Sequence, residues 1–238
     1  MEKLLTGGRF FTSPLDTKGR RQFLEIFLEY RKNFPLKPTR NLSLAEKLPS
    51  YLYQTFRISR WFQLANDSEI AREQSGQPKV LEQKEFVKRY EQAIEVISSE
   101  LKNRPMIWCH GHFKPKEIYA ESGGAKYYLT DFAHTKMYPE GYELAFIIWA
   151  DHFINADWQL DYNDWRSDVV DWLADLHLVA DQLAIKNFNQ LMRVSLVERI
   201  LGTILADITA SARDFQEKKK RLHLMYLLLD ETLRGDLI

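Results

Sequence analysis

Hydrophobic residues recur every three or four positions along most of this chain, which is the spacing of an amphipathic helix. The first such stretch covers residues 17–34, and Pro35 and Pro38 interrupt the pattern directly after it. Ser43 and Glu46 are spaced as in a capping box, in which each side chain bonds the backbone amide of the other. The chain therefore opens with one predicted helix and the start signal of a second.

Further helices follow on both sides of a short non-helical segment. Pro49 marks where the second helix would kink, and the polar residues 66–78 predict a loop after it. Pro78 predicts the first turn of a third helix, whose apolar face ends at Leu101. After residue 141 the helical spacing returns in four stretches, at about 142–155, 164–184, 187–213 and 217–234.

The pattern changes in the middle of the chain. Residues 106–109 form a short apolar run that is typical of a strand. Residues 118–119 and 127–129 flank a Gly-Gly pair, and two short β runs around such a turn are typical of a hairpin. The sequence therefore predicts a mainly α fold with a small central β-hairpin, in a single domain over residues 1–238. Its expected parts are helical at 15–104, loops and hairpin at 105–135, and helical again at 140–236.

Composition and charge narrow the class of protein. Hydrophobic residues make up 45% of the 238 residues, which is enough for a globular core. Lys+Arg and Asp+Glu balance at 33 each, and this argues against a dedicated nucleic-acid binder because such proteins need a basic surface. The basic run at 218–221 predicts a solvated helix face.

Cysteine usage and hydropathy indicate a compartment. Cys109 is the single cysteine, so an intramolecular disulfide is impossible and a reducing compartment is favoured. The N-terminal residues lack the long apolar region of a signal peptide. No run approaches the ~20 apolar residues of a membrane span. We expect a soluble, cytoplasmic protein with no membrane partner.

Candidate chemistry concentrates in the loops beside the predicted hairpin. Residues 108–119 read WCHGHFKPKEIY and hold two histidines, while residues 127–134 read YYLTDFAH. A rigid hairpin with charged and histidine-rich loops is a suitable frame for reactive side chains. These two runs therefore contain the candidate functional site.

Three motifs in order resemble those of the aminoglycoside phosphotransferase and choline kinase group, which has the protein-kinase-like fold. Residues 110–118, HGHFKPKEI, resemble its catalytic loop, which reads His-Gly-Asp, four residues, then Asn. Residues 129–132, LTDF, resemble the strand end that carries a metal-binding aspartate, and residues 141–145, GYELA, resemble the start of the next helix. The resemblance implies the C-terminal lobe of a kinase-like fold over roughly residues 15–235.

The chain also departs from that family. The catalytic aspartate aligns with His112, the metal-binding asparagine with Glu117, and the helix aspartate with Glu143. Phosphoryl transfer from ATP further needs a cover over the phosphates and a lysine that pairs with them, which in the family sit on a β-rich N-terminal lobe. The residues before His110 read as helices, so we expect that lobe to be absent from this chain.

The resemblance assigns expected cofactor contacts. Asp131, and Glu117 with altered geometry, would hold the Mg²⁺ that accompanies ATP, because hard cations prefer carboxylate oxygens. Lys114 and Lys116 would face the ATP phosphates. The alternatives, that Asp131 only caps a turn and that both lysines are ordinary exposed residues, stay open.

The histidines have competing interpretations. His112 would act as the general base at the position of the catalytic aspartate, or would be a loop residue without a catalytic duty. His110 would support the loop as a structural residue. A different class of site, a transition-metal centre of a hydrolase, would draw on a larger set of donors, namely Cys109, His110, His112, Asp131 and His134.

Acidic and aromatic residues outside the loops allow two interpretations each. One set of acids would form an acidic surface for cationic substrates, as in aminoglycoside-binding relatives, or would serve as helix N-caps and solvated residues, which we favour. These acids are Asp157, Asp161, Asp164 and Asp168. The tryptophans would form a ligand cage, or core contacts, which we favour. They are Trp108, Trp149, Trp158, Trp165 and Trp172.

These patterns lead to one functional hypothesis and its alternatives. We expect a diverged small-molecule kinase-like domain, with impaired or lost ATP-dependent transfer of a phosphoryl group to a small-molecule hydroxyl. The alternative is a non-catalytic binding or scaffold module on the same lobe. The expected partner is a small-molecule substrate or a protein, and the sequence leaves the substrate and the oligomeric state open.

Overall fold

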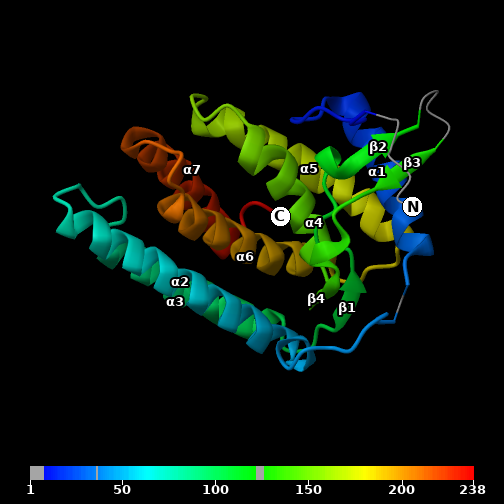
Figure 1. Cartoon of the computed structure of the whole chain (residues 1–238), viewed down its shortest axis with the longest axis horizontal. Helices are drawn as coiled ribbons and strands as arrows, with labels where there is room; N and C mark the ends of the chain where they lie inside the picture. Colours follow the sequence, from blue (N-terminus) through cyan, green and yellow to red (C-terminus); the bar gives the residue numbers. More distant parts are fainter. Residues whose placement is uncertain (1–7, 36, 122–125) are drawn as a thin grey trace, which may run out of the picture.

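The computed structural model describes residues 8–35, 37–121 and 126–238, and it is mainly α-helical with a small β part, as the sequence predicts (Figure 1). The α-helices are α1 (Thr17–Asn33), α2 (Ser50–Gln74), α3 (Gln83–Glu100), α4 (Tyr142–Ile148), α5 (Tyr162–Gln182), α6 (Phe188–Thr209) and α7 (Phe215–Arg234). The strands are β1 (Met106–Cys109), β2 (Ile118–Ala120), β3 (Tyr127–Leu129) and β4 (Lys136–Pro139). A π-helical turn, Trp149–Phe153, continues α4.

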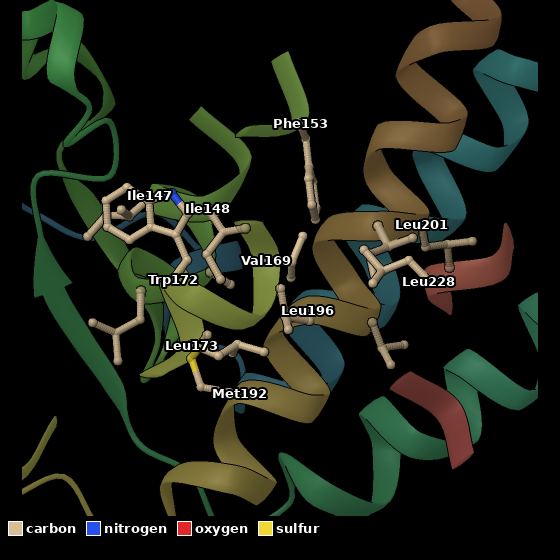
Figure 2. Close-up of a cluster of buried hydrophobic side chains, with 14 of the residues drawn as sticks. Ile147, Ile148, Phe153, Val169, Trp172, Leu173, Met192, Leu196, Leu201 and Leu228 are labelled. Carbon is tan, nitrogen blue, oxygen red and sulfur yellow. The ribbon is translucent and has the colours of Figure 1, made fainter. Parts of the chain in front are cut away.

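Helix α6 is the centre of the core. It packs against α2 and α3 on one side and against α7 on the other (Figure 1). Val169, Trp172 and Leu173 of α5 face Met192 and Leu196 of α6 in a buried cluster (Figure 2). Because α6 is apolar around most of its circumference, it can be buried on several sides at once.

The tryptophans serve mainly as core residues, as expected. Trp108, Trp165 and Trp172 are buried, and Trp149 and Trp158 are half-buried. Except for Trp108, their rings pack against other aromatic and aliphatic side chains of the core. Burying an indole removes a large apolar area from water, so these residues stabilise the helical packing.

The predicted loop at residues 66–78 is wrong over most of its length, because α2 continues to Gln74. Ala65 and Glu69 are buried on the inner face of this helix. The Glu69 carboxylate accepts hydrogen bonds from the backbone amides of Val80 and Leu81, at 2.7 and 3.0 Å. A polar stretch can therefore remain helical when one of its acids satisfies the amides of the returning chain.

Two proline predictions near α2 and α3 are also wrong. Pro49 does not kink α2 but is the residue before its first turn, since a proline disfavours helical geometry at the preceding residue. Ser43 and Glu46 do exchange capping-box bonds, but they open only a 3₁₀ turn. Pro78 lies in the loop before α3, which begins five residues later at Gln83.

The strands form two separate antiparallel pairs. Strands β2 and β3 form the predicted hairpin, and its Gly-Gly pair at 123–124 lies outside the described residues. Strand β1 was expected from the sequence, but its partner β4 was not. The two strands pair in a register that joins Met106 to Pro139 and Cys109 to Lys136. Both pairs are therefore parts of one interrupted ribbon, and residues 110–117 and 130–135 form the two loops of the interruption.

The basic run at 218–221 is not the solvated face that the sequence predicts. Lys218 and Arg221 are buried. The Arg221 Nε lies 2.6 Å from Asp207, and its guanidinium carbon lies 3.5 Å from the ring centre of Trp158. Lys218 donates a hydrogen bond to a backbone carbonyl of α6. Two of the four basic residues thus hold α7 against its neighbours.

Candidate functional site

The candidate site lies where the two loops of the interrupted ribbon meet. The Nδ1 atom of His112 lies 2.5 Å from a carboxylate oxygen of Asp131. The rings of His112 and His134 stack with their centres 3.7 Å apart, and His134 Nε2 lies 3.9 Å from the other Asp131 oxygen. One potential ligand atom from each of the three residues lies within 4.8 Å of the other two.

Unusual backbone angles in both loops create this proximity. Gly111 has a φ of 77°, and a Cβ atom built on it would lie 2.4 Å from the Tyr138 ring and 2.5 Å from the carbonyl oxygen of His134. The glycine thus lets the first loop pass directly against the second. Asp131 has a φ of 61°, a left-handed conformation that aspartate tolerates better than most residues.

His110 fixes the first loop from inside. It is fully buried, and its Nε2 lies 2.8 Å from the Thr130 carbonyl oxygen in the second loop. Its Nδ1 accepts the backbone amide of His112, and its own amide donates to the Tyr30 hydroxyl at 2.8 Å. Burial lowers the pKa of His110 to about 4, so the ring is neutral, with Nε2–H as the donor.

The His112–Asp131 contact is a hydrogen bond between a neutral imidazole and a carboxylate. Burial lowers the pKa of His112, and the bond to Asp131 offsets this only in part. Burial raises the pKa of the Asp131 carboxyl, but the hydrogen bond from His112 and the nearby positive charges outweigh it, so the net pKa is lowered. His112 therefore donates from Nδ1, and its Nε2 remains an acceptor.

The other expected cofactor residues already have partners. Glu117 accepts a hydrogen bond from the Thr130 hydroxyl at 2.7 Å and lies 3.2 Å from the Lys114 ammonium. Lys116 donates to the Asn155 side chain at 2.8 Å. All three residues belong to the loop that carries His112. Glu117 and Lys114 pair within that loop, whereas the Lys116 side chain reaches Asn155, after the π-helical turn.

The larger metal-donor set that the sequence suggests is divided by the fold. His112, Asp131 and His134 come together, whereas Cys109 and His110 are buried on the inner side of the ribbon and are not part of that group. The neighbour of Cys109 is Glu143, and burial raises the pKa of both groups. The His-x-His spacing therefore does not place both histidines at one site.

Glu143 holds α4 against α1. Its carboxylate accepts a hydrogen bond from the Tyr30 hydroxyl at 2.8 Å and lies 3.2 Å from the Arg31 guanidinium. It is 4% exposed, so this pair is shielded from water. Tyr30 also receives the His110 amide, which links Glu143 to the first loop through one shared hydroxyl.

A cavity of about 450 Å³ opens on the outer side of the histidine pair. His112 and His134 line it together with Lys136, Arg57 and Arg199. Its other walls include aromatic side chains of α2, β4, α4 and the π-helical turn. Sequence reasoning missed Arg57 and Arg199. The only sequence signal was the adjacent Glu198-Arg199 pair within a largely apolar stretch of α6, and it concerns Arg199 alone.

The acidic cluster after the π-helical turn lies elsewhere and serves the fold. Asp161 is the N-cap of α5 and accepts a hydrogen bond from the Asp164 amide at 3.0 Å. Asp168 pairs with Arg20 at 2.6 Å. The favoured N-cap interpretation is confirmed for Asp161, while Asp168 has a different structural role.

Comparisons with known proteins give little beyond this geometry. No family model matches the chain, and no curated protein matches it. Among solved structures the chain is similar to an ethanolamine kinase from Plasmodium vivax, with 14% identity and a TM-score of 0.46, over 90% of this chain and 74% of that one. Values this low define neither a family nor an activity. No helix among the described residues has both the length and the apolar character needed to span a bilayer.

Proposed function

We propose that this chain is a kinase-like C-terminal lobe, related to small-molecule phosphotransferases, in which ATP-dependent phosphoryl transfer is impaired or lost. One observation supports the proposal above the others. The loop positions that would carry the catalytic residue and the metal-binding aspartate do meet, but His112 stands at the first and hydrogen-bonds the second, Asp131. The two loops thus meet as the family resemblance implies, but the side chains at the key positions differ from those of the family.

The side chains present fit the Mg²⁺ of such enzymes poorly. Mg²⁺ takes an octahedral shell of oxygen ligands, including several waters. Asp131 is bound by an imidazole, and Glu117 is bound by a hydroxyl and an ammonium group. Lys114 and Lys116, the expected phosphate contacts, are paired with Glu117 and Asn155. ATP and Mg²⁺ would therefore have to displace several existing interactions.

Residual proton transfer would depend on His112. With Nδ1–H held by Asp131, the ring keeps one tautomer and leaves Nε2 as the proton acceptor. His112 also lines the cavity, so a hydroxyl bound there could reach it. A neutral imidazole is a competent general base near pH 7. We therefore propose His112 as the base of any surviving activity, with Asp131 as the group that orients it.

We expect the protein to bind Mg·ATP only weakly, with a dissociation constant above the millimolar range. The double variant His112→Asp with Glu117→Asn restores the family residues and removes the imidazole from Asp131. This change should tighten Mg-dependent nucleotide binding by about tenfold or more, since ligands and their immediate supports set metal affinity. Isothermal titration calorimetry with and without Mg²⁺ measures both.

Asp131→Ala is the control for that titration. It should leave the weak binding of the unmodified protein unchanged and should abolish the gain in the double variant. Tight, Mg-dependent binding by the unmodified protein that Asp131→Ala removes would contradict the proposed loss and would favour an active phosphotransferase.

A transition-metal centre is the second candidate function, and the grouping of His112, Asp131 and His134 favours it. Two imidazoles and one carboxylate suit Zn²⁺ or Co²⁺ better than Mg²⁺. Three protein ligands would leave a coordination position for water, as hydrolytic sites require. The cavity beside the two histidines offers room for a substrate.

We expect Co²⁺ to bind this group if it is a metal centre, and removal of either imidazole to weaken binding by about 100-fold. His134→Ala is the informative variant because His134 is the more exposed histidine and is tied to less of the fold. His223→Ala, on an exposed position of α7, is the matched control. Visible absorption during Co²⁺ titration and displacement by Zn²⁺ give the affinities. Equal binding by both variants would rule out this site.

A further inference from the structure

The cavity beside the histidine pair has an excess of positive charge. Arg57, Lys136 and Arg199 line it, and no aspartate or glutamate is among its described lining residues. Glu198, behind the wall, lies 3.5 Å from Arg57 and 2.9 Å from Arg199, so one carboxylate serves two guanidinium groups. The cavity wall therefore carries three cationic side chains, and a single carboxylate, that of Glu198, pairs with two of them.

The third cation has no carboxylate of its own. None of the ion pairs between described residues includes Lys136, and the acid that influences it, Glu46, already pairs with Arg40 at 2.7 Å. Burial and then the nearby Arg57 lower the pKa of Lys136. An anion bound in the cavity would relieve this unbalanced charge.

Aromatic rings surround the two guanidinium groups. The Arg199 guanidinium lies 5.0 Å from the ring centre of Tyr142 and 5.8 Å from that of Trp149. The Arg57 guanidinium lies 4.7 Å from the ring centre of Trp61. Such rings would favour a cationic ligand in an open aromatic cage. Here the guanidinium groups of Arg57 and Arg199 already lie beside the rings, where a cationic ligand would bind. The ligand that suits these arginines is therefore an anion.

We propose that this cavity binds a small organic anion, a carboxylate or phosphate carried on a flat apolar body. The anionic group would meet Lys136 and the two arginines, and the apolar part would lie against Trp61 and Trp149. Arginine suits this role because its planar donors match the oxygens of carboxylates and phosphates. Binding desolvates both partners, so the charge interaction acts at reduced dielectric.

The inference goes beyond the proposed function and differs from what the family resemblance implies. An acidic surface for cationic substrates would need exposed acids at the site, whereas Asp161 caps α5 and Asp168 pairs with Arg20, away from this cavity. The anion site also does not use Asp131. His112 of the proposed active site lines the same cavity, but anion binding needs no Mg²⁺ and is measured without nucleotide, so the two proposals can fail separately.

A ligand series on the unmodified protein tests the proposal first. We expect phenyl phosphate and benzoate to bind, to quench tryptophan fluorescence because Trp61 and Trp149 line the cavity, and to lose affinity as salt is added. Benzyltrimethylammonium, similar in size and opposite in charge, should not bind. Preferential binding of the ammonium compound, or no binding of either anion, would overturn the proposal.

Two variants then locate the site. Lys136→Gln should weaken phenyl phosphate binding about tenfold, the effect of one charge-assisted hydrogen bond. Lys84→Gln, which removes an exposed lysine of α3, should have no effect. Phenyl phosphate should bind equally well with and without Mg²⁺, which separates this site from Mg-dependent nucleotide binding. If Lys136→Gln binds phenyl phosphate as tightly as the unmodified protein, the anion is not held in this cavity.

Discussion

Gly111→Ala is expected to destabilise the protein by about 3 kcal/mol or more and to disrupt the candidate site. A left-handed conformation costs a residue with a Cβ about 1–2 kcal/mol, and forced overpacking adds about 1–3 kcal/mol. The added methyl would meet both the Tyr138 ring and the carbonyl oxygen of His134. Urea denaturation measures the loss, and the metal or nucleotide titrations report the displaced loop.

Gly76→Ala separates the two causes of that loss. Gly76 has a similar φ of 72°, but a Cβ there meets nothing within 4 Å. This variant should therefore show only the conformational cost, about 1–2 kcal/mol. Equal losses for the two variants would mean that the loops can separate freely, and the close approach at Gly111 would not be what holds the site together.

Asp207→Ala is expected to reduce the free energy of unfolding by about 3–5 kcal/mol, since it leaves the Arg221 guanidinium buried without its carboxylate. The Arg221 side chain is 2% exposed, and its Nε and Nη2 both bond Asp207. Arg213 pairs with the same carboxylate. The change should appear as a lower urea midpoint with an unchanged denaturant slope.

The exposed pair between Arg234 and Asp236 is the matched control. Its donor and acceptor lie 2.6 Å apart, but both side chains are more than half exposed. Asp236→Ala should cause no measurable change, because surface ion pairs of this kind contribute little. A small effect of Asp207→Ala, close to that of the control, would show that α7 can move to let water reach Arg221.

The periodic pattern of apolar residues was sufficient for most helices and for the β2–β3 hairpin, because both depend on local spacing. It failed where distant residues decide the outcome. Residues 66–74 are polar, yet they are helical because Glu69 satisfies amides on the returning chain. Strand β4 is short and ends in Pro139, so only its pairing with β1 defines it.

The candidate site was predictable in part. The loops that carry His112 and Asp131 were recognised because their motifs lie in short continuous segments, and the structure brings those two residues together. The roles of both remain predictions. Arg57 and Arg199 could not be assigned to the site from spacing, since they come from α2 and α6, which meet only in the folded chain. Local sequence patterns can identify a loop, but the residues that line a cavity come from distant parts of the chain and are known only from the tertiary structure.

The interrupted ribbon has a consequence for how this protein can change over evolutionary time. Strand pairs hold both ends of each loop, and the helices around them form a core that excludes His112, Glu117 and Asp131. Substitutions at these positions should change the chemistry of the loops and leave most core contacts in place. The loops can thus accept new side chains, and with them new ligands, while the fold stays intact.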